Sequence, residues 1–308
     1  MIKAFRNFMS RRTINYKVRN HVMNSFSSFE AFQQIRKQTE SKRQAANRPH
    51  EVLYFHKADD PYSHLTIQCI EKLISSYEIT LKFILVGEEN LETVHEPSLY
   101  NIYCLQDVYR IASFYNIDFQ ADKYPAKELV EKANSILTAV KSEDLIEISN
   151  KVSSALWEGD ISALDKLSST YFATKAEVKE NLIQGNKIRD AKGYYFGSAF
   201  YYEKELYWGV DRLPYLEERL ADLGAKKVHE TENICPLELK APKQFTSDKK
   251  VNLYYYPSLN SPYTFVSTKR IRQMQEGYPI NLITKPVLPM LMRMMTIPAF
   301  KAKYIISD

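Results

Sequence analysis

The sequence predicts an α/β fold, with one whole unit followed by the opening of a second. An apolar strand pattern at 52–55, a helical pattern at 61–77 and another strand pattern at 79–86 indicate a β-α-β unit. Its right-handed crossover makes the two strands parallel. A helical region, two short strands and a helix follow, and the opening pattern then recurs further along the chain.

The recurrence is long and keeps its register. Pro61-Tyr62 returns as Pro262-Tyr263, an offset of 201 residues (262 minus 61). Such an offset indicates a duplicated domain, because solenoid repeats run over roughly 20–50 residues. The first copy continues for more than a hundred residues beyond the position that matches Asp308. We therefore expect the second copy to be incomplete.

The elements between the two openings follow from helical spacing and from turn residues. Gly159 marks a turn within the helical region, and Glu203-Lys204 separates two short aromatic strands, which predicts a hairpin. Gly224 stops the closing helix. The predicted helices are 100–115, 125–140, 144–157, 161–168, 175–190 and 211–223, and the predicted hairpin strands are 200–202 and 205–208.

These elements predict four regions. Residues 1–48 form a basic helical extension, 51–224 the first domain with a helical insert at about 100–190, 225–249 a linker, and 251–308 the incomplete second repeat. The first 29 residues hold six Lys and Arg and no acidic residue. They suit a helix that packs on the protein or stays mobile, a surface or partner contact, or, in a eukaryote, mitochondrial targeting.

Composition argues against several classes of function. The net charge is only +5 and no long basic run or zinc-finger spacing occurs, so we expect no nucleic-acid partner. No stretch approaches the ~20 apolar residues that span a bilayer. The three cysteines include no CxxC pair, which argues against a disulfide oxidoreductase and a metal site and favours a reducing, cytoplasmic setting.

The element order and several motifs resemble the DsbA-like branch of the thioredoxin fold, and within it the 2-hydroxychromene-2-carboxylate isomerase and kappa-class glutathione transferase family. That family opens with strand, Ser-Pro-Tyr-Ser and helix, and ends with Phe-Trp-Gly-x-Asp-Arg-Leu. The resemblance covers residues 51–224, with 251–308 as a partial second match. The matching segments are Asp60-Pro61-Tyr62-Ser63, Trp157-Glu158-Gly159-Asp160-Ile161-Ser162, Gly197-Ser198-Ala199-Phe200 and Tyr207-Trp208-Gly209-Val210-Asp211-Arg212-Leu213.

The resemblance implies glutathione as cofactor and a small-molecule substrate. The family's first Ser contacts the glutathione sulfur, and its place is taken by Asp60 in the first copy and by Ser261 in the second. These two are the candidate catalytic residues. Asp211 and Arg212 match residues near the glutamyl end of glutathione. The full set of candidate binding residues is Tyr62, Ser63, Ser198, Trp208, Asp211, Arg212 and Tyr263.

Two departures from the family pattern weaken the first copy as a glutathione site. A carboxylate at Asp60 would occupy the N–H groups at the helix start and repel a thiolate; it suits a helix cap or, alternatively, a general base. Ser198 replaces a cis-proline, and because a non-proline cis bond costs about 2.5–4 kcal/mol we expect a trans bond there. Asp211 suits either an ammonium contact or a cap of the closing helix.

Two functions remain open at this point. One is a glutathione-dependent isomerase or transferase acting on a small aromatic or electrophilic compound, with Ser261 or Asp60 orienting the thiolate. The other is a catalytically degenerate relative that serves as a binding or scaffold module. A homodimer is compatible with both, since residues 251–308 would have to pack on the first unit, dimerise, or belong to a longer protein.

Overall fold

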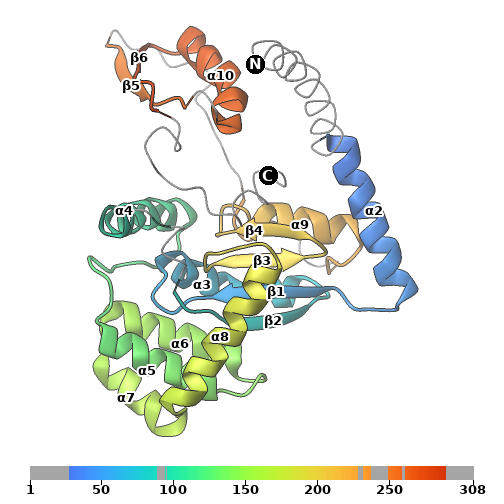
Figure 1. Ribbon diagram of the computed structural model, residues 1–308, viewed down its shortest axis with the longest axis vertical. Helices are drawn as coiled ribbons and strands as arrows, with labels where there is room; N and C mark the ends of the chain where they lie inside the picture. Colours follow the sequence, from blue (N-terminus) through green and yellow to red (C-terminus); the bar gives the residue numbers. More distant parts are fainter. Residues whose placement is uncertain are drawn as a thin grey trace, which may run out of the picture. The chain divides into compact units, whose positions relative to one another are not determined.

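The computed structural model describes residues 28–88, 94, 96–227, 232–236, 249–258 and 261–288 (Figure 1). The described residues up to 236 belong to one compact unit, and those from 249 onward belong to a second. We call these the first unit and the second unit.

A mixed sheet organises the first unit. Its described strands are β1 (Glu51–His56), β2 (Thr80–Leu85), β3 (Ala199–Tyr202) and β4 (Glu205–Trp208), in the order β2-β1-β3-β4. β1 and β2 are parallel, whereas β3 runs antiparallel to both β1 and β4. With α3 (Pro61–Ser76) joining β1 to β2 and α9 (Leu213–Asp222) following β4, this is a thioredoxin-like core. The predicted fold class is confirmed for the first unit.

Strand β1 is covered on both faces, which explains its uninterrupted apolar sequence. Val52 and Tyr54 belong to the main core, whereas Leu53 and Phe55 belong to a smaller cluster on the other face. At the hairpin between β3 and β4, Glu203 and Lys204 have φ of 43° and 75°. Two positive φ angles in succession are the geometry of a two-residue hairpin turn, so the predicted hairpin is confirmed.

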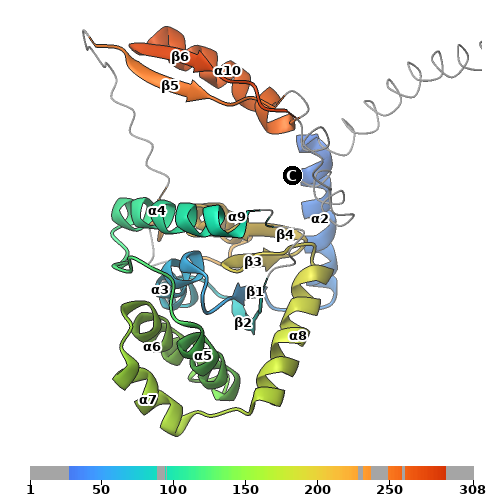
Figure 2. The same cartoon turned by 60° about the vertical axis from the view of Figure 1, so that its left-hand side comes forward.

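The helical insert lies between β2 and β3, where the sequence predicts it. In Figure 2 the helices α5 to α7 gather on the β2 side of the sheet, while α4 lies at the level of α9. Gly185 of α8 faces the backbone of Leu85 so closely that a Cβ there would lie 1.9 Å from the Leu85 carbonyl oxygen. The insert helices are α4 (Pro97–Tyr115), α5 (Lys127–Ala139), α6 (Leu145–Glu158), α7 (Ile161–Thr170) and α8 (Lys175–Ala191).

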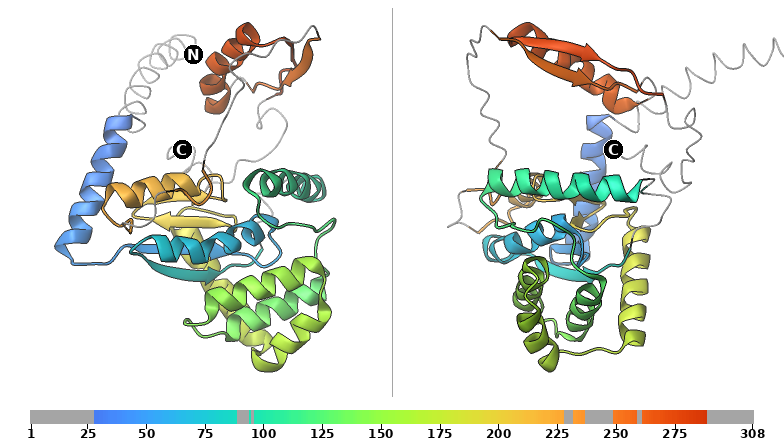
Figure 3. Two further views of the ribbon diagram at one scale, coloured as in Figure 1. Left: turned by 180° about the vertical axis from the view of Figure 1, so that it is seen from behind. Right: turned by 90° about the vertical axis from the view of Figure 1, so that its left-hand side faces the viewer.

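Helix α2 (Phe29–Ala45) is the described part of the basic extension, and it packs on the first unit (Figure 3). Arg36 donates from Nε to the Glu205 carboxylate over 2.9 Å, and Arg219 donates to the same carboxylate over 3.1 Å. The phenol of Tyr207 donates to it as well, over 2.8 Å. The interpretations left open concern the first 29 residues, of which 1–27 lie outside the described residues, so they stay predictions.

Part of the predicted linker belongs to the first unit. Lys227 N–H donates to the Ser76 carbonyl over 2.9 Å, and Ile234 N–H donates to both carboxylate oxygens of Glu217 over 3.1 Å. Tyr77 also donates to Glu217, over 3.3 Å. Residues 225–227 and 232–236 of the predicted linker 225–249 are therefore bound to the first unit. The buried Glu217 holds the segment 232–236.

The described part of the second unit is a β-α-β element. Strands β5 (Val251–Tyr255) and β6 (Ile280–Thr284) are parallel, and α10 (Pro262–Gly277) connects them. Across the part of the chain that the structure describes, no helix combines the length and the apolar character needed to cross a membrane.

Candidate functional site

The start of helix α3 is capped by Asp60. The Asp60 carboxylate accepts from Tyr62 N–H over 3.3 Å and from Ser63 N–H over 3.0 Å. The Ser63 hydroxyl donates to it over 2.7 Å. Pro61 occupies the first turn, where a missing N–H costs nothing. The sequence left two interpretations of Asp60 open, a helix cap and a general base. The contacts of its carboxylate are those of a helix cap.

Ser63 and Ser198 are structural in this conformation. Both side chains are fully buried. Ser63 Oγ accepts from Lys57 N–H over 3.2 Å, and Ser198 Oγ shares a 2.6 Å hydrogen bond with Thr66 Oγ1. Both side chains are thus engaged in hydrogen bonds inside the protein, and the predicted ligand roles of the two serines stay predictions.

The loop before β3 packs directly on the capped helix start. The peptide bond before Ser198 is trans, as predicted, and Ser198 has φ of +54°. Its carbonyl accepts from Gly209 N–H over 2.8 Å. A Cβ at Gly197 would lie 2.9 Å from the Asp60 carboxylate, so only glycine allows this close approach.

Aromatic side chains from four elements or loops meet beside the helix start. The Tyr62 and Trp208 ring centroids are 4.9 Å apart, and Trp208 contacts Phe196 at 5.9 Å. Phe196 stacks on Tyr100 of α4 at 5.9 Å. Tyr62 Oη donates to Asp107 over 2.8 Å. Burial, followed by the neighbouring Cys104 and the hydrogen bond to Asp107, raises the pKa of Tyr62, so its phenol is a neutral donor.

A pocket of about 260 Å³ opens at this place, and its lining is aromatic and acidic. Lys57 is the cation of the lining, and its Nζ lies 3.4 Å from an Asp59 carboxylate oxygen. Cys104 also lines it, and burial raises the pKa of that thiol, which keeps it protonated. The lining residues are Lys57, Asp59, Asp60, Pro61, Tyr62, Glu88, Val94, Pro97, Tyr100, Asn101, Cys104, Tyr124, Phe196 and Trp208.

Helix α4 contributes side chains to this pocket that were not among the residues predicted from the sequence. Tyr100, Cys104 and Asp107 are spaced by four and three residues, which places them on one helix face. That spacing was a usable signal. Tyr124 and Phe196 lie in loops and have no comparable pattern. The described residues hold no group of three or more His, Cys, Asp or Glu arranged to bind a metal ion.

Asp211 and Arg212 are not among the residues that line the pocket. They lie beside each other, with 3.6 Å between Arg212 Nη1 and an Asp211 carboxylate oxygen, and burial raises the pKa of Asp211. Helix α9 begins at Leu213, two residues later than predicted, and its cap position is Arg212. The predicted capping role of Asp211 is therefore wrong. The glutamyl-binding role stays a prediction.

The second unit presents a similar helix start. Ser261 is the cap residue of α10, and its side chain makes no capping hydrogen bond to the helix. Its N–H donates to the Ser258 carbonyl over 2.9 Å. The predicted ligand role of Tyr263 concerns a side chain outside the described residues.

No family model and no curated protein matches the chain. Among solved structures, 2-hydroxychromene-2-carboxylate isomerase is similar at 18% identity and a TM-score of 0.41, over 56% of this chain and 96% of that one. A candidate protein disulfide isomerase from Nitrosomonas europaea is similar at 15% identity and a TM-score of 0.44, over 56% and 96% of the two chains. The fold assignment rests on the strand order and directions of the first unit.

Proposed function

We propose that the first unit is a thioredoxin-like module that binds a small molecule and does not activate a thiolate. The observation that carries this is the position of the Asp60 carboxylate, which holds the N–H groups of Tyr62 and Ser63. Those groups and the helix dipole are what would stabilise a thiolate at this place. Here they already neutralise part of a fixed negative charge, so a second anion gains little from them.

The pocket lining indicates the charge of the ligand. Among the described residues, it carries three carboxylates, from Asp59, Asp60 and Glu88, against the one ammonium of Lys57, which is paired with Asp59. Glutathione has a net negative charge at neutral pH and is disfavoured in such a lining. The residues of the first unit therefore do not fit the glutathione implied by the family resemblance. An uncharged or cationic aromatic compound fits better, since aromatic rings attract cations.

Calorimetric titration of glutathione tests the first part of the proposal. The wild-type chain is compared with Asp60→Ser, which restores the family hydroxyl, and with Asp60→Asn, which retains a capping side chain without the charge. We expect no saturable binding to the first unit of the wild type. Binding that appears with Asp60→Ser but not with Asp60→Asn would show that the lost hydroxyl matters. Wild-type binding that survives Ser261→Ala and is lost in Asp60→Asn contradicts the proposal.

Two aromatic probes of opposite charge test the second part. Benzyltrimethylammonium and benzoate are titrated while tryptophan fluorescence is followed, because Trp208 lines the pocket. The other tryptophan, Trp157, lies in the insert, and Trp157→Phe leaves a signal from the pocket alone. We expect saturable quenching by the cation and a much weaker response to benzoate. Tighter binding of benzoate contradicts the assignment of charge.

A second candidate function concerns the second unit, whose described part we propose is a copy of the opening of the first. One hydrogen bond of the first unit recurs in the second at the 201-residue offset. Lys57 N–H donates to Ser63 Oγ over 3.2 Å, and Ser258 N–H donates to Thr264 Oγ1 over 3.0 Å. This recurrence supports duplication, because a side-chain hydroxyl at the matching position accepts from the matching main-chain N–H in each unit.

In that second copy the Ser261 hydroxyl, which makes no capping hydrogen bond, supports glutathione-linked isomerase or transferase chemistry. A hydroxyl at a helix start can donate to a thiolate without adding negative charge. If this candidate is right, glutathione binds the wild type, Asp60→Asn leaves the affinity unchanged and Ser261→Ala abolishes binding. Equal affinity for wild type and Ser261→Ala would rule out this candidate while leaving the proposal for the first unit intact.

A further inference from the structure

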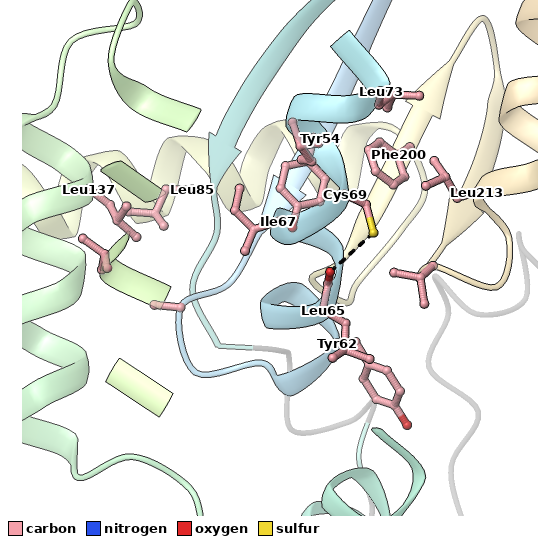
Figure 4. Packing of buried hydrophobic residues seen from close by; sticks show 14 of the residues in the cluster. Tyr54, Tyr62, Leu65, Ile67, Cys69, Leu73, Leu85, Leu137, Phe200 and Leu213 are labelled. Atoms are coloured by element: carbon pink, nitrogen blue, oxygen red, sulfur yellow. Dashed lines mark hydrogen bonds between the residues drawn. The ribbon is translucent and has the colours of Figure 1, made fainter. Parts of the chain in front are cut away.

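Two cysteines that are far apart in the sequence meet inside the first unit. Cys69 lies on α3 and Cys235 lies in the segment 232–236, and their Sγ atoms are 3.8 Å apart. Their side chains are 6% and 1% exposed. In Figure 4 the Cys69 sulfur lies among Leu65, Phe200 and Leu213. The two thiols are therefore in van der Waals contact in an apolar environment.

A buried carboxylate fixes the segment that carries Cys235. Both oxygens of Glu217 accept from the N–H of Ile234, the residue directly before Cys235, at 3.1 Å each. Glu217 is 1% exposed, and the Tyr77 phenol donates to it over 3.3 Å. Because the neighbouring main chain is clamped in this way, Cys235 is held against Cys69 and not merely near it.

We propose that Cys69 and Cys235 are a redox pair that forms a disulfide and so joins the segment 232–236 covalently to helix α3. A disulfide needs an S–S distance of about 2.05 Å, which side-chain rotation from van der Waals contact can reach. The bond would close a loop of 166 residues. It would hold the chain where it leaves the first unit, since the boundary to the second unit follows at residue 237.

The oxidant is a small-molecule disulfide such as oxidised glutathione, acting by thiol–disulfide exchange. The thiolate of one cysteine attacks a sulfur of the oxidant, breaks its S–S bond and releases one reduced thiol. The second cysteine, as thiolate, then attacks the protein-bound sulfur of this mixed disulfide and releases the other reduced thiol. In total the two protein thiols lose two electrons and two protons, and one oxidant disulfide becomes two thiols.

Burial sets the speed of this reaction and protects the pair. The hydrogen-bonding contact with Cys69, followed by burial, raises the pKa of the Cys235 thiol, so little thiolate is present while the segment is docked. The oxidant therefore reaches the pair when the segment 232–236 opens. Reaction should accelerate when the Glu217 clamp is weakened, for example by Glu217→Gln.

Thiol counting after oxidation tests the proposal. The reduced full chain is equilibrated with oxidised glutathione, denatured, alkylated and weighed, and its peptides are mapped. The sequence has three cysteines, and Cys104, on α4, serves as the internal reference. We expect alkylation to fall from three sites to one, with the remaining label on Cys104 and with the peptides of Cys69 and Cys235 linked. Cys104→Ala should retain the link, and Cys69→Ala and Cys235→Ala should each abolish it.

Three results would overturn the proposal. They are three alkylated cysteines at equilibrium, stable mixed disulfides with glutathione in place of the internal link, and a link that includes Cys104. Mapping the wild type alone distinguishes these cases, so the test does not depend on the folding of any variant. A linked chain should also run as a monomer on a non-reducing gel and unfold at a higher urea concentration than the reduced chain.

Discussion

The openings of the two units share a backbone pattern. In the first unit Glu51 pairs with Thr80, and in the second Val251 pairs with Ile280. In both units, paired residues are therefore 29 positions apart in the sequence (80 minus 51 and 280 minus 251). Val86 N–H donates to the His56 carbonyl over 2.8 Å, and the matching bond from Val287 to Pro257 measures 2.9 Å. A short stretch of sequence is thus sufficient to specify the β-α-β geometry.

The two openings differ in burial. Five of the six residues of β1 are buried, whereas none of the five residues of β5 is. In the first unit, β1 lies between β2 and β3; among the described residues, β5 pairs with β6 alone. Local sequence therefore sets the backbone geometry of each opening, while contacts with later parts of the chain bury most of the strand residues.

The largest expected difference between the openings is in core packing. Leu73 is fully buried in α3, and its counterpart at the 201-residue offset, Met274, is 39% exposed. We expect Leu73→Ala to lower the free energy of unfolding by about 2–5 kcal/mol. Urea unfolding followed by tryptophan fluorescence measures this, since both tryptophans belong to the first unit.

Met274→Ala is the matched control, and we expect an effect below about 0.5 kcal/mol, as for most exposed positions. Amide hydrogen exchange within α10 is the measurement for this variant. If exchange in α10 rises as strongly for Met274→Ala as exchange in α3 does for Leu73→Ala, the second unit is packed as tightly as the first and the comparison fails.

Acid should destabilise the first unit through two buried histidines. Burial lowers the pKa of His64 to about 4 and, with the nearby His64 charge adding to it, lowers that of His56 to about 3. The unfolded chain takes up these protons near pH 6.5, so stability falls as the pH drops from 6.5 toward 4 and 3. In this range each histidine lowers the free energy of unfolding by about 1.4 kcal/mol per unit of falling pH. Glu217 and Asp211, with raised pKa values, act in the opposite direction.

Comparing variants isolates the histidine term from the net slope. The second copy has Phe265 at the position of His64, so His64→Phe imports its residue type. The free energy of unfolding of wild type and variant is measured with urea between pH 7 and pH 5. Its dependence on pH should correspond to about one proton fewer taken up on unfolding in the variant. An unchanged slope would mean that His64 does not titrate as its burial implies.

The effects on stability of removing the two cap side chains should differ by a smaller amount. Asp60 accepts two backbone N–H bonds and one hydroxyl bond, whereas Ser261 makes no capping bond. We expect Asp60→Ala to cost about 1–2 kcal/mol in urea unfolding. Hydrogen exchange in the first turn of α10 should change little in Ser261→Ala. A larger effect for Ser261→Ala than for Asp60→Ala would reverse the assignment of the two caps.

The smallest effect is expected for cross-strand surface pairs. Lys82 Nζ lies 2.6 Å from a Glu51 carboxylate oxygen, and both side chains are well exposed. We expect Lys82→Ala to cost at most about 1 kcal/mol, and less at high salt because screening weakens exposed ion pairs. The second unit has an uncharged pair instead, with Asn281 donating to Asn252 over 2.9 Å. Hydrogen exchange in β5 of Asn281→Ala should therefore be insensitive to salt.

Much of the secondary structure follows from the sequence because it depends on near neighbours. Apolar spacing identified α3 and the strands of the first unit, and Glu203-Lys204 identified the hairpin. The start of α9 was placed too early because Asp211 suits a cap by residue type, although in the structure Arg212 occupies the cap position. The helix cap at Asp60 was also open to prediction, since a carboxylate before proline at a helix start has a local role.

The order of the elements, the β-α-β openings and a carboxylate at the start of the first helix of the first unit all follow from the amino-acid sequence alone. Only the tertiary structure decided that Ser63 and Ser198 are buried, that Tyr100 and Cys104 join the pocket, and that Cys235 lies against Cys69. The difference arises from how far apart in the sequence the interacting residues lie. Periodicity and capping depend on residues a few positions apart, whereas burial and side-chain contact depend on segments brought together from as far as 166 residues along the chain.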